Sequence, residues 1–147
     1  MNIFKSGMPW LTDETVSSNA LCSVTSLDHV VLTVASIEAT IAFYTKFLGM
    51  KHSTFTSKGD ERHALQFGNQ KINLHKSGAE FEPKAHHPTP GSADLCFLTK
   101  TPVDQLLAKL HDARVHVEEE GKVVDRTGAT GALKSIYIRD PDDNLIE

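Results

Sequence analysis

The sequence predicts a single α+β domain built from two copies of one β-α-β-β-β unit. The chain of 147 residues is long enough for one domain with a hydrophobic core. Strand-like and helix-like patterns follow in the same order in each half. The two halves are separated by residues 76–92, whose prolines and glycines predict a connection without regular structure.

The first unit is predicted over residues 25–76. A β-branched segment at 27–34 predicts its first strand. Ser36 is placed to cap a helix with apolar residues at helical spacing, and Gly49 is placed to end it. Turn-forming residues then separate three short strands, predicted at residues 51–56, 63–67 and 70–75.

The second unit is predicted over residues 92–147 and repeats this order. A strand is expected at 93–98, and Pro102 opens a helix with apolar residues at helical spacing. The last strand is expected to continue past the end of the chain as given. The remaining elements are strands at 115–118, around 123–124 and at 133–139, a glycine-containing loop at 127–131, a turn at 140–144 and a short apolar end at 145–146.

Residues 1–24 are predicted to form an N-terminal tail that is partly disordered, with a short helix at 13–20. The tail lacks the apolar core of a signal peptide, and no apolar run approaches the length of a transmembrane helix. Cys22 and Cys96 are too few for a disulfide framework and are interpreted as reduced thiols. A cytoplasmic protein is therefore expected.

The charge of the chain argues against nucleic acids and anionic membranes as partners. The formal net charge is -4 and the pI is near 6.0, whereas both of those partners require a basic face. No cluster of Lys and Arg with interleaved aromatic residues occurs. A small-molecule substrate is the partner that remains, and the sequence leaves open whether two chains associate as a homodimer.

Four residues that can bind metal ions occupy related positions in the two units. His29 lies on the first strand of the first unit, and His75 ends its last strand. Asp94 takes the place of His29 in the second unit, and Glu147 takes the place of His75. Helices on one face of the sheet leave the other face for side chains or a pocket.

These motifs resemble the vicinal oxygen chelate superfamily, which includes glyoxalase I, extradiol dioxygenases, and fosfomycin-resistance and bleomycin-binding proteins. The resemblance covers roughly residues 25–147. It rests on the segments at 27–32, 43–44, 48–49 and 140–147, while the connection at 81–92 is similar to the glyoxalase domain-containing protein 5 group. The resemblance implies paired β-α-β-β-β modules in an open, cup-like mixed barrel with helices outside, and metal ligands at His29, His75, Asp94 and Glu147.

The residue chemistry agrees with this implication. Two His and one or two carboxylates suit Zn, Fe, Mn, Ni or Co better than Ca or Mg. A divalent metal ion held by them is the expected cofactor, and Glu147 or Asp94 is the expected catalytic acid–base group. For each residue a structural role is the competing interpretation: a hydrogen-bonded or solvated His, a strand-entry Asp, or a frayed terminal Glu.

Other residues receive interpretations of the same kind. Cys96 shares the strand face of Asp94 and can line a cavity, although a buried, hydrophobic role is favoured. The pair His86 and His87 is interpreted as part of a surface loop because prolines surround it. Three basic residues can bind an anionic substrate group, with solvated surface charge as the commoner role: Arg126, Lys134 and Arg139.

Three functional hypotheses follow. The first is a metal-dependent lyase or isomerase of the glyoxalase I type, which moves a proton on a thiohemiacetal substrate. The second is an extradiol-type dioxygenase. Tyr137 and Glu147 favour it, but this chain lacks the His that the extradiol signature has before the Tyr. The third is a non-catalytic module that encloses a small molecule, as the drug-binding members of the superfamily do.

Overall fold

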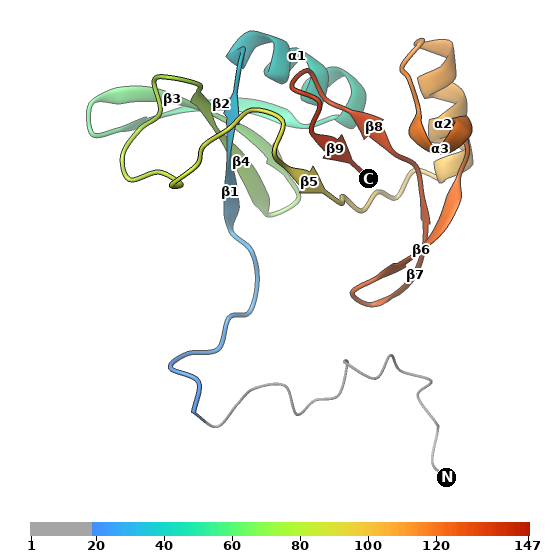
Figure 1. Cartoon of the computed structure of the whole chain (residues 1–147), viewed down its shortest axis with the longest axis horizontal. Coiled ribbons are helices and arrows are strands. Elements are labelled where there is room, and N and C mark those ends of the chain that lie inside the picture. Colours follow the sequence, from blue (N-terminus) through green and yellow to red (C-terminus); the bar gives the residue numbers. More distant parts are fainter. Residues whose placement is uncertain (1–18) are drawn as a thin grey trace.

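The computed structural model describes residues 19–147, in which the two predicted modules lie side by side (Figure 1). The predicted tail, including the short helix expected at 13–20, lies largely outside the described residues. The first module contains β1 (His29–Val34), α1 (Ile37–Leu48), β2 (Lys51–Ser57), β3 (Asp60–Phe67) and β4 (Gln70–Lys76). The second contains β5 (Asp94–Leu95), α2 (Val103–Asp112), α3 (Glu118–Gly121), β6 (Val124–Gly128), β7 (Gly131–Ser135), β8 (Ile138–Arg139) and β9 (Leu145–Ile146).

The helix α1 begins and ends at the residues that the sequence predicts. The Ser36 hydroxyl accepts a 3.1 Å hydrogen bond from the Ala39 backbone N–H, which satisfies one free donor of the first turn. Gly49 ends the helix with a φ of 65°, a conformation that glycine adopts without steric cost. Both ends of α1 are thus fixed locally by the sequence.

The strands of the first module form one sheet in the order β1-β4-β3-β2, with β1 parallel to β4 and the other pairs antiparallel. One face packs against α1 and carries buried residues such as Leu32, Val34 and Ile72. The opposite face is called the open face below. It carries His29 and His75 with their ladder partners Lys71 and Thr33, because these four residues alternate along β1 and β4 with the buried ones.

The second module is less regular than the sequence predicts. Its strands form a sheet of order β5-β9-β8 and a separate hairpin of β6 and β7, and both sheets remain open. The strand expected at 115–118 is wrong: only Val117 forms a bridge, to Ile138. The chain then turns through Glu119 and Glu120, whose φ values of 53° and 58° are incompatible with a strand.

Two further expectations for the second module are corrected. The strand expected at 93–98 is limited to β5, and the strand expected at 133–139 is broken into β7 and β8. The predicted loop at 127–131 is the tight end of the β6–β7 hairpin, in which Gly128 pairs with Gly131. The hairpin therefore departs from the sheet that carries β8, which explains why the chain makes two short strands where alternation suggests one long strand.

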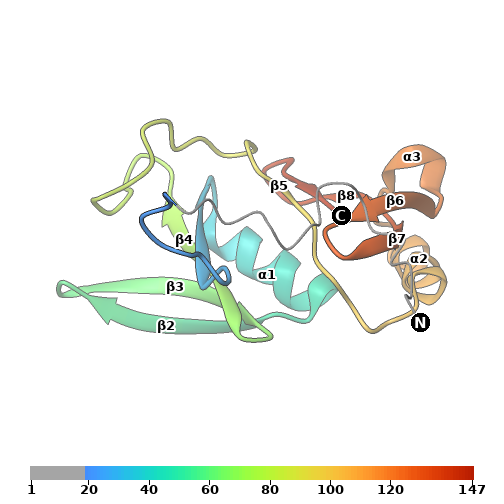
Figure 2. The ribbon, with the colours of Figure 1, turned by 90° about the horizontal axis from the view of Figure 1, so that it is seen from below.

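The two modules are joined through the turn between β8 and β9, which packs against the first module. Tyr44 of α1 is fully buried and bonds to Asp140 in this turn. The Ala35 backbone N–H donates to the Asp142 carboxylate at 3.1 Å. One hydrophobic core contains residues of both modules. Figure 2 shows the same arrangement from below, with α1 between the first sheet and the second module.

Within residues 19–147, no helix combines the length and the apolar character that crossing a membrane would require.

Candidate functional site

An open cavity of about 320 Å³ lies on the second module. It contains both carboxylates that the sequence predicts as catalytic, Asp94 and Glu147. The other lining residues are Glu118, Glu119, Arg126, Tyr137, Arg139 and Leu145. Acidic, basic and phenolic groups therefore meet in one cavity, as they do in sites for small polar ligands.

Strand pairing explains why the two carboxylates share this cavity. Asp94 pairs with Leu145 in the parallel ladder of β5 and β9, and Glu147 lies two residues beyond Leu145 on the same face. The Glu147 backbone N–H donates to the Leu95 carbonyl at 2.8 Å, which continues the ladder past β9. The equivalent positions that the sequence predicts in the second unit are thus neighbours in space.

The Glu147 carboxylate is held in place by a neighbouring hydroxyl. Ser135 Oγ donates a 2.6 Å hydrogen bond to Glu147 Oε1. Partial burial and the charge of Glu147 raise the pKa of the Cys96 thiol above its usual value. The prediction that Cys96 is buried is wrong, because the residue is exposed and faces this carboxylate.

Two of the three predicted basic residues line the cavity, and each is held by an acidic group. Arg126 Nε donates to the Tyr137 hydroxyl at 3.0 Å, and its Nη2 lies 3.7 Å from a Glu119 oxygen. Partial burial raises the pKa of Tyr137, and the charge of Glu147 acts in the same direction. Lys134 forms an ion pair with Asp125 on the β6–β7 hairpin and is not a lining residue.

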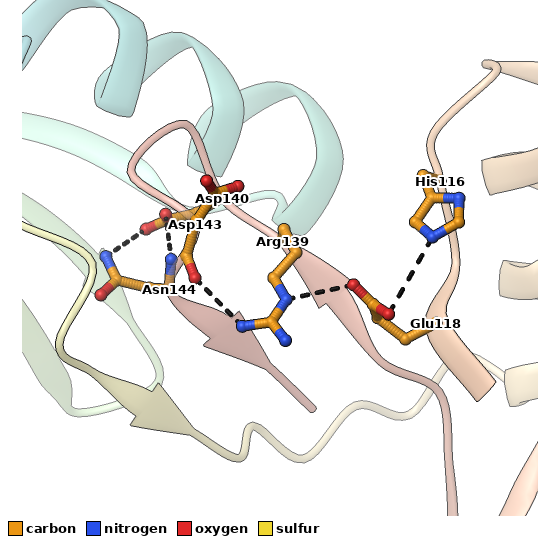
Figure 3. Close-up of polar contacts among 6 residues, drawn as sticks. All are labelled: His116, Glu118, Arg139, Asp140, Asp143 and Asn144. Atoms are coloured by element: carbon orange, nitrogen blue, oxygen red, sulfur yellow. Dashed lines mark hydrogen bonds and ion pairs between the residues drawn. The ribbon is translucent and has the colours of Figure 1, made fainter.

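Arg139 links the cavity to the turn that joins the modules. Its Nε donates to Glu118 Oε1 at 3.1 Å, and its Nη1 donates to the Asp143 carbonyl at 3.1 Å (Figure 3). The other Glu118 oxygen lies 4.0 Å from His116 Nε2. The position of Arg139 therefore depends on the strained segment that begins at Glu118 and on the β8–β9 turn.

The two predicted His ligands lie on the open face of the first sheet. His29 is at the start of β1, with its side chain 45% exposed and its Nδ1 atom 2.7 Å from Asp28 Oδ1. His75 is only 6% exposed, so it does not point to solvent. Burial, followed by the nearby Arg62 charge, lowers the pKa of His75. The two rings are offset along the sheet, because His75 pairs with Thr33 rather than with His29.

The four predicted ligands therefore do not meet: Asp94 and Glu147 share the cavity of the second module, whereas His29 and His75 lie at separate positions along the open face of the first sheet. In the part of the chain that the structure describes, no three His, Cys, Asp or Glu side chains gather closely enough to hold a metal ion. The donor types suit a divalent transition metal, but a single chain does not bring all four donors together. Their assignment as ligands stays a prediction.

Sequence reasoning missed two residues of the open face. Asn73 Oδ1 and Arg62 Nε are both buried without a hydrogen-bond partner within residues 19–147. Asn73 lies between Lys71 and His75 on β4 and is one same-face position closer to His29 than His75 is. The signal in the sequence was the run of alternate polar residues at 71, 73 and 75. A strand face that only packs against a hydrophobic core would carry apolar residues at these positions.

Comparisons with known proteins agree on one family. The family model described as Glyoxalase/Bleomycin resistance protein/Dioxygenase superfamily matches residues 26–147. The chain is 54% identical over 121 residues to the virulence protein STM3117 of Salmonella typhimurium, covering 82% of this chain and 81% of that one. It is 52% identical over 130 residues to the glyoxalase domain-containing protein RDO1 of Mycosarcoma maydis, covering 85% and 68% respectively.

Solved structures show the same fold. The crystal structure of STM3117 superposes with a TM-score of 0.79 at 53% identity, covering 85% of this chain and 95% of that chain. A lactoylglutathione lyase from Agrobacterium tumefaciens superposes with a TM-score of 0.61 at 22% identity, covering 84% and 91%. At that lower identity the likeness concerns the fold alone. The predicted α+β fold is confirmed, and like these structures it has open, unclosed mixed sheets and few helices.

Proposed function

The chain belongs to the glyoxalase/bleomycin resistance protein/dioxygenase superfamily, and we propose that it is a metal-dependent enzyme of the glyoxalase I type. Its reaction would be the transfer of a proton within a small substrate that offers two adjacent oxygen atoms. The observation that carries this proposal is the placement of Asp94 and Glu147 in one cavity with Arg126 and Arg139. The superfamily includes a lactoylglutathione lyase of the same fold.

Glu147 is the proposed acid–base group. A carboxylate that takes and returns a proton must be held at hydrogen-bond distance from its target. The 2.6 Å bond from Ser135 fixes Glu147 Oε1, and the Cys96 thiol and the Tyr137 hydroxyl face the same carboxylate. The raised pKa values of Cys96 and Tyr137 keep both groups neutral near pH 7, so neither competes with Glu147 as an anion.

The two arginines are proposed to bind and orient the substrate. Negative charge develops on the substrate oxygens when a neighbouring C–H proton is removed, and guanidinium groups fixed beforehand stabilise it. Arg126 is fixed by Tyr137 and Glu119, and Arg139 by Glu118. Because these acidic partners already balance the two cations, the cavity does not bind simple anions indiscriminately.

His29, His75, Asp94 and Glu147 would hold the metal ion. A bound divalent ion would polarise the substrate oxygens and acidify the adjacent C–H bond. The two halves of this set lie on different modules, and β1 and β5 each pair with one strand only, which leaves an edge of each sheet free. We therefore propose that two copies of the chain associate, so that the first module of one copy faces the second module of the other.

Metal content and turnover test the proposal together. Protein loaded with Zn, Ni, Mn, Fe or Co is expected to bind about one ion for each site, that is, for His29 and His75 of one copy with Asp94 and Glu147 of the other. It is also expected to isomerise the adduct of methylglyoxal and glutathione. Glu147→Gln should abolish turnover, whereas Glu120→Gln should not, because Glu120 contacts only Lys122 at the surface. Metal-loaded, dimeric protein without turnover on this adduct would reject the glyoxalase I version.

The assembly is tested separately by mixing inactive variants. His29→Ala and Glu147→Gln each disable a different module, so a dimer that exchanges subunits should regain part of the activity when the two variants are combined. A monomer at all concentrations, or a mixture without recovery, contradicts a site shared between two copies.

The dioxygenase alternative is weakened by the partner of Tyr137. An acid–base His is expected beside this Tyr in the extradiol enzymes, but Arg126 occupies that place here. Oxygen uptake with a catechol and ferrous iron would reverse this ranking.

A further inference from the structure

The open face of the first sheet holds two polar atoms that have no hydrogen-bond partner in the part of the chain that the structure describes. Arg62 Nε and Asn73 Oδ1 are buried, and neither has a hydrogen-bond partner among residues 19–147. Within those residues Arg62 also forms no ion pair, and its Cζ lies 4.0 Å from the centre of the Phe81 ring. Buried polar atoms in native proteins almost always have partners, so two orphans on one face indicate a ligand site.

Strand register places these groups together with His75. Asn73 pairs with Ala64 across β4 and β3, and the preceding pair is Leu74 with His63. Arg62 follows next on β3, beside His75 and on the same face. Ala64 lies next to Arg62 and Asn73 on this face and is fully buried.

Phe81 covers this group from the connection between the modules. Its ring meets the His75 ring edge to face, with 5.4 Å between centres, and lies over the Arg62 guanidinium. A stacked guanidinium still presents its N–H edge in the plane, where it can donate two parallel bonds. The ring is therefore a cover that orients Arg62 without using its donors.

The local charge selects a monoanion. Arg62 is the cation of the group, and Glu80 is the acidic residue that acts on His75. The Glu80 carboxylate is held by the Gly78 backbone N–H at 3.1 Å. One cation therefore faces one nearby carboxylate, an environment that disfavours a second negative charge on the ligand.

We propose that Arg62, Asn73 and His75 form a subsite for a small carboxylate that carries a hydroxyl group beside the carboxyl carbon. Arg62 binds the carboxylate through its N–H edge, Asn73 Oδ1 accepts a hydrogen bond from the hydroxyl group, and the His75 ring lines the subsite. Phe81 turns aside to admit the ligand. The inference deepens the proposed function by naming a substrate class, and it rests on that function only for the claim that the ligand reacts.

Binding of lactate to the metal-free, full chain tests the subsite. We expect a dissociation constant on the order of millimolar, as for other very small ligands, with chemical-shift changes confined to the open face around residues 62, 73, 75 and 81. Lactamide lacks the charge and should not bind. Propionate lacks the hydroxyl and should bind several-fold more weakly. Arg62→Met should lower the lactate affinity at least tenfold, whereas the matched surface control Arg114→Met should not change it.

Three results would overturn the subsite. They are equal lactate binding by wild type and folded Arg62→Met, phosphate binding in preference to lactate, and the absence of any shift at the open face of the wild-type protein. The wild-type measurement decides even if the variants fail to fold. Lactate binding without turnover of any metal-loaded form would remove the proposed function and keep the subsite, while turnover without lactate binding would do the reverse.

Discussion

The Tyr44 hydroxyl donates a 2.8 Å hydrogen bond to Asp140 Oδ2, an atom 96 residues later in the chain and in the other module. Both residues are buried. Asp140 also accepts bonds from the Asn144 side chain and from the backbone N–H groups of Asp142 and Asn144. One buried carboxylate thus fixes the β8–β9 turn and attaches it to α1.

Removing the Tyr44 hydroxyl should therefore destabilise the fold. Tyr44→Phe keeps the ring in the core but takes one donor from a buried carboxylate, for which we expect a loss of about 1.5–3 kcal/mol in the free energy of unfolding. Denaturant unfolding measures it. Tyr137→Phe serves as the control, because its hydroxyl bonds to the exposed Arg126 at the cavity rather than to a buried carboxylate in the core. An equal loss in both variants would contradict the special role of the Tyr44 bond.

The same bond predicts a stability loss at high pH. Burial and the Asp140 charge raise the pKa of Tyr44 far above its usual range. The folded state therefore keeps this phenol protonated while the unfolded state releases the proton above about pH 10, so stability falls as pH rises through that value. The chain has two tyrosines, and absorbance titration of the folded protein should show only Tyr137 ionising, with Tyr44 following at unfolding. Ionisation of both in folded protein would contradict this.

Glu147→Gln should lower catalytic turnover by roughly 10²- to 10⁴-fold, the usual contribution of a positioned acid–base group. The amide keeps the shape of the side chain and can still accept the bond from Ser135. Folding should therefore be unchanged, which circular dichroism and thermal unfolding can verify alongside the Glu120→Gln control. A variant that retains full turnover would transfer the acid–base role to Asp94.

Asn73→Leu should stabilise the protein although it disables the proposed subsite. The substitution removes a buried, unpartnered carbonyl oxygen and puts an apolar group of similar size in its place, which removes a desolvation penalty of about 1–3 kcal/mol. Thermal unfolding without ligand is the measurement. A marked loss of stability would mean that Asn73 has a structural partner and would argue against its role in ligand binding.

Gly91→Ala should be more harmful than Gly59→Ala. Both glycines have positive φ, 79° and 86°, so an alanine at either is strained by roughly 1 kcal/mol. A Cβ at Gly91 would also lie 2.4 Å from the Asp142 carbonyl oxygen, whereas a Cβ at Gly59 meets nothing within 4 Å. The difference between the two unfolding midpoints measures the cost of the close contact between the connection at Gly91 and the β8–β9 turn. Equal midpoints would show that the turn shifts to make room for the added Cβ.

The sequence predicts the first module well because its signals are local. The cap at Ser36, the left-handed Gly49 and the alternation along β3 and β4 each act within a few residues. The second module is predicted less well. Its chain turns at Glu119 and Glu120, and glutamate rarely adopts positive φ, so propensity cannot locate this turn.

The candidate site divides in the same way. The ligand candidates His29, His75, Asp94 and Glu147 can be found from repeat position, and the last two do share a cavity. Arg62 cannot be identified from repeat position. Its burial depends on Phe81, which belongs to a connection without regular structure. Contacts made by an irregular segment follow from tertiary packing and leave no periodic trace in the sequence.

The attachment of the β8–β9 turn to α1 also bears on the order in which the molecule assembles. Hairpins join β2, β3 and β4, and the parallel pairing of β1 with β4 closes the loop from His29 to Lys71 for a ladder of six residue pairs. The parallel pairing of β5 with β9 closes a loop of similar length, from Asp94 to Leu145, for a ladder of only two residue pairs. We expect the first module to act as the folding nucleus, on which the β8–β9 turn docks later through Tyr44 and Ala35. Mutations in α1 should then slow refolding, whereas mutations in β9 should mainly speed unfolding.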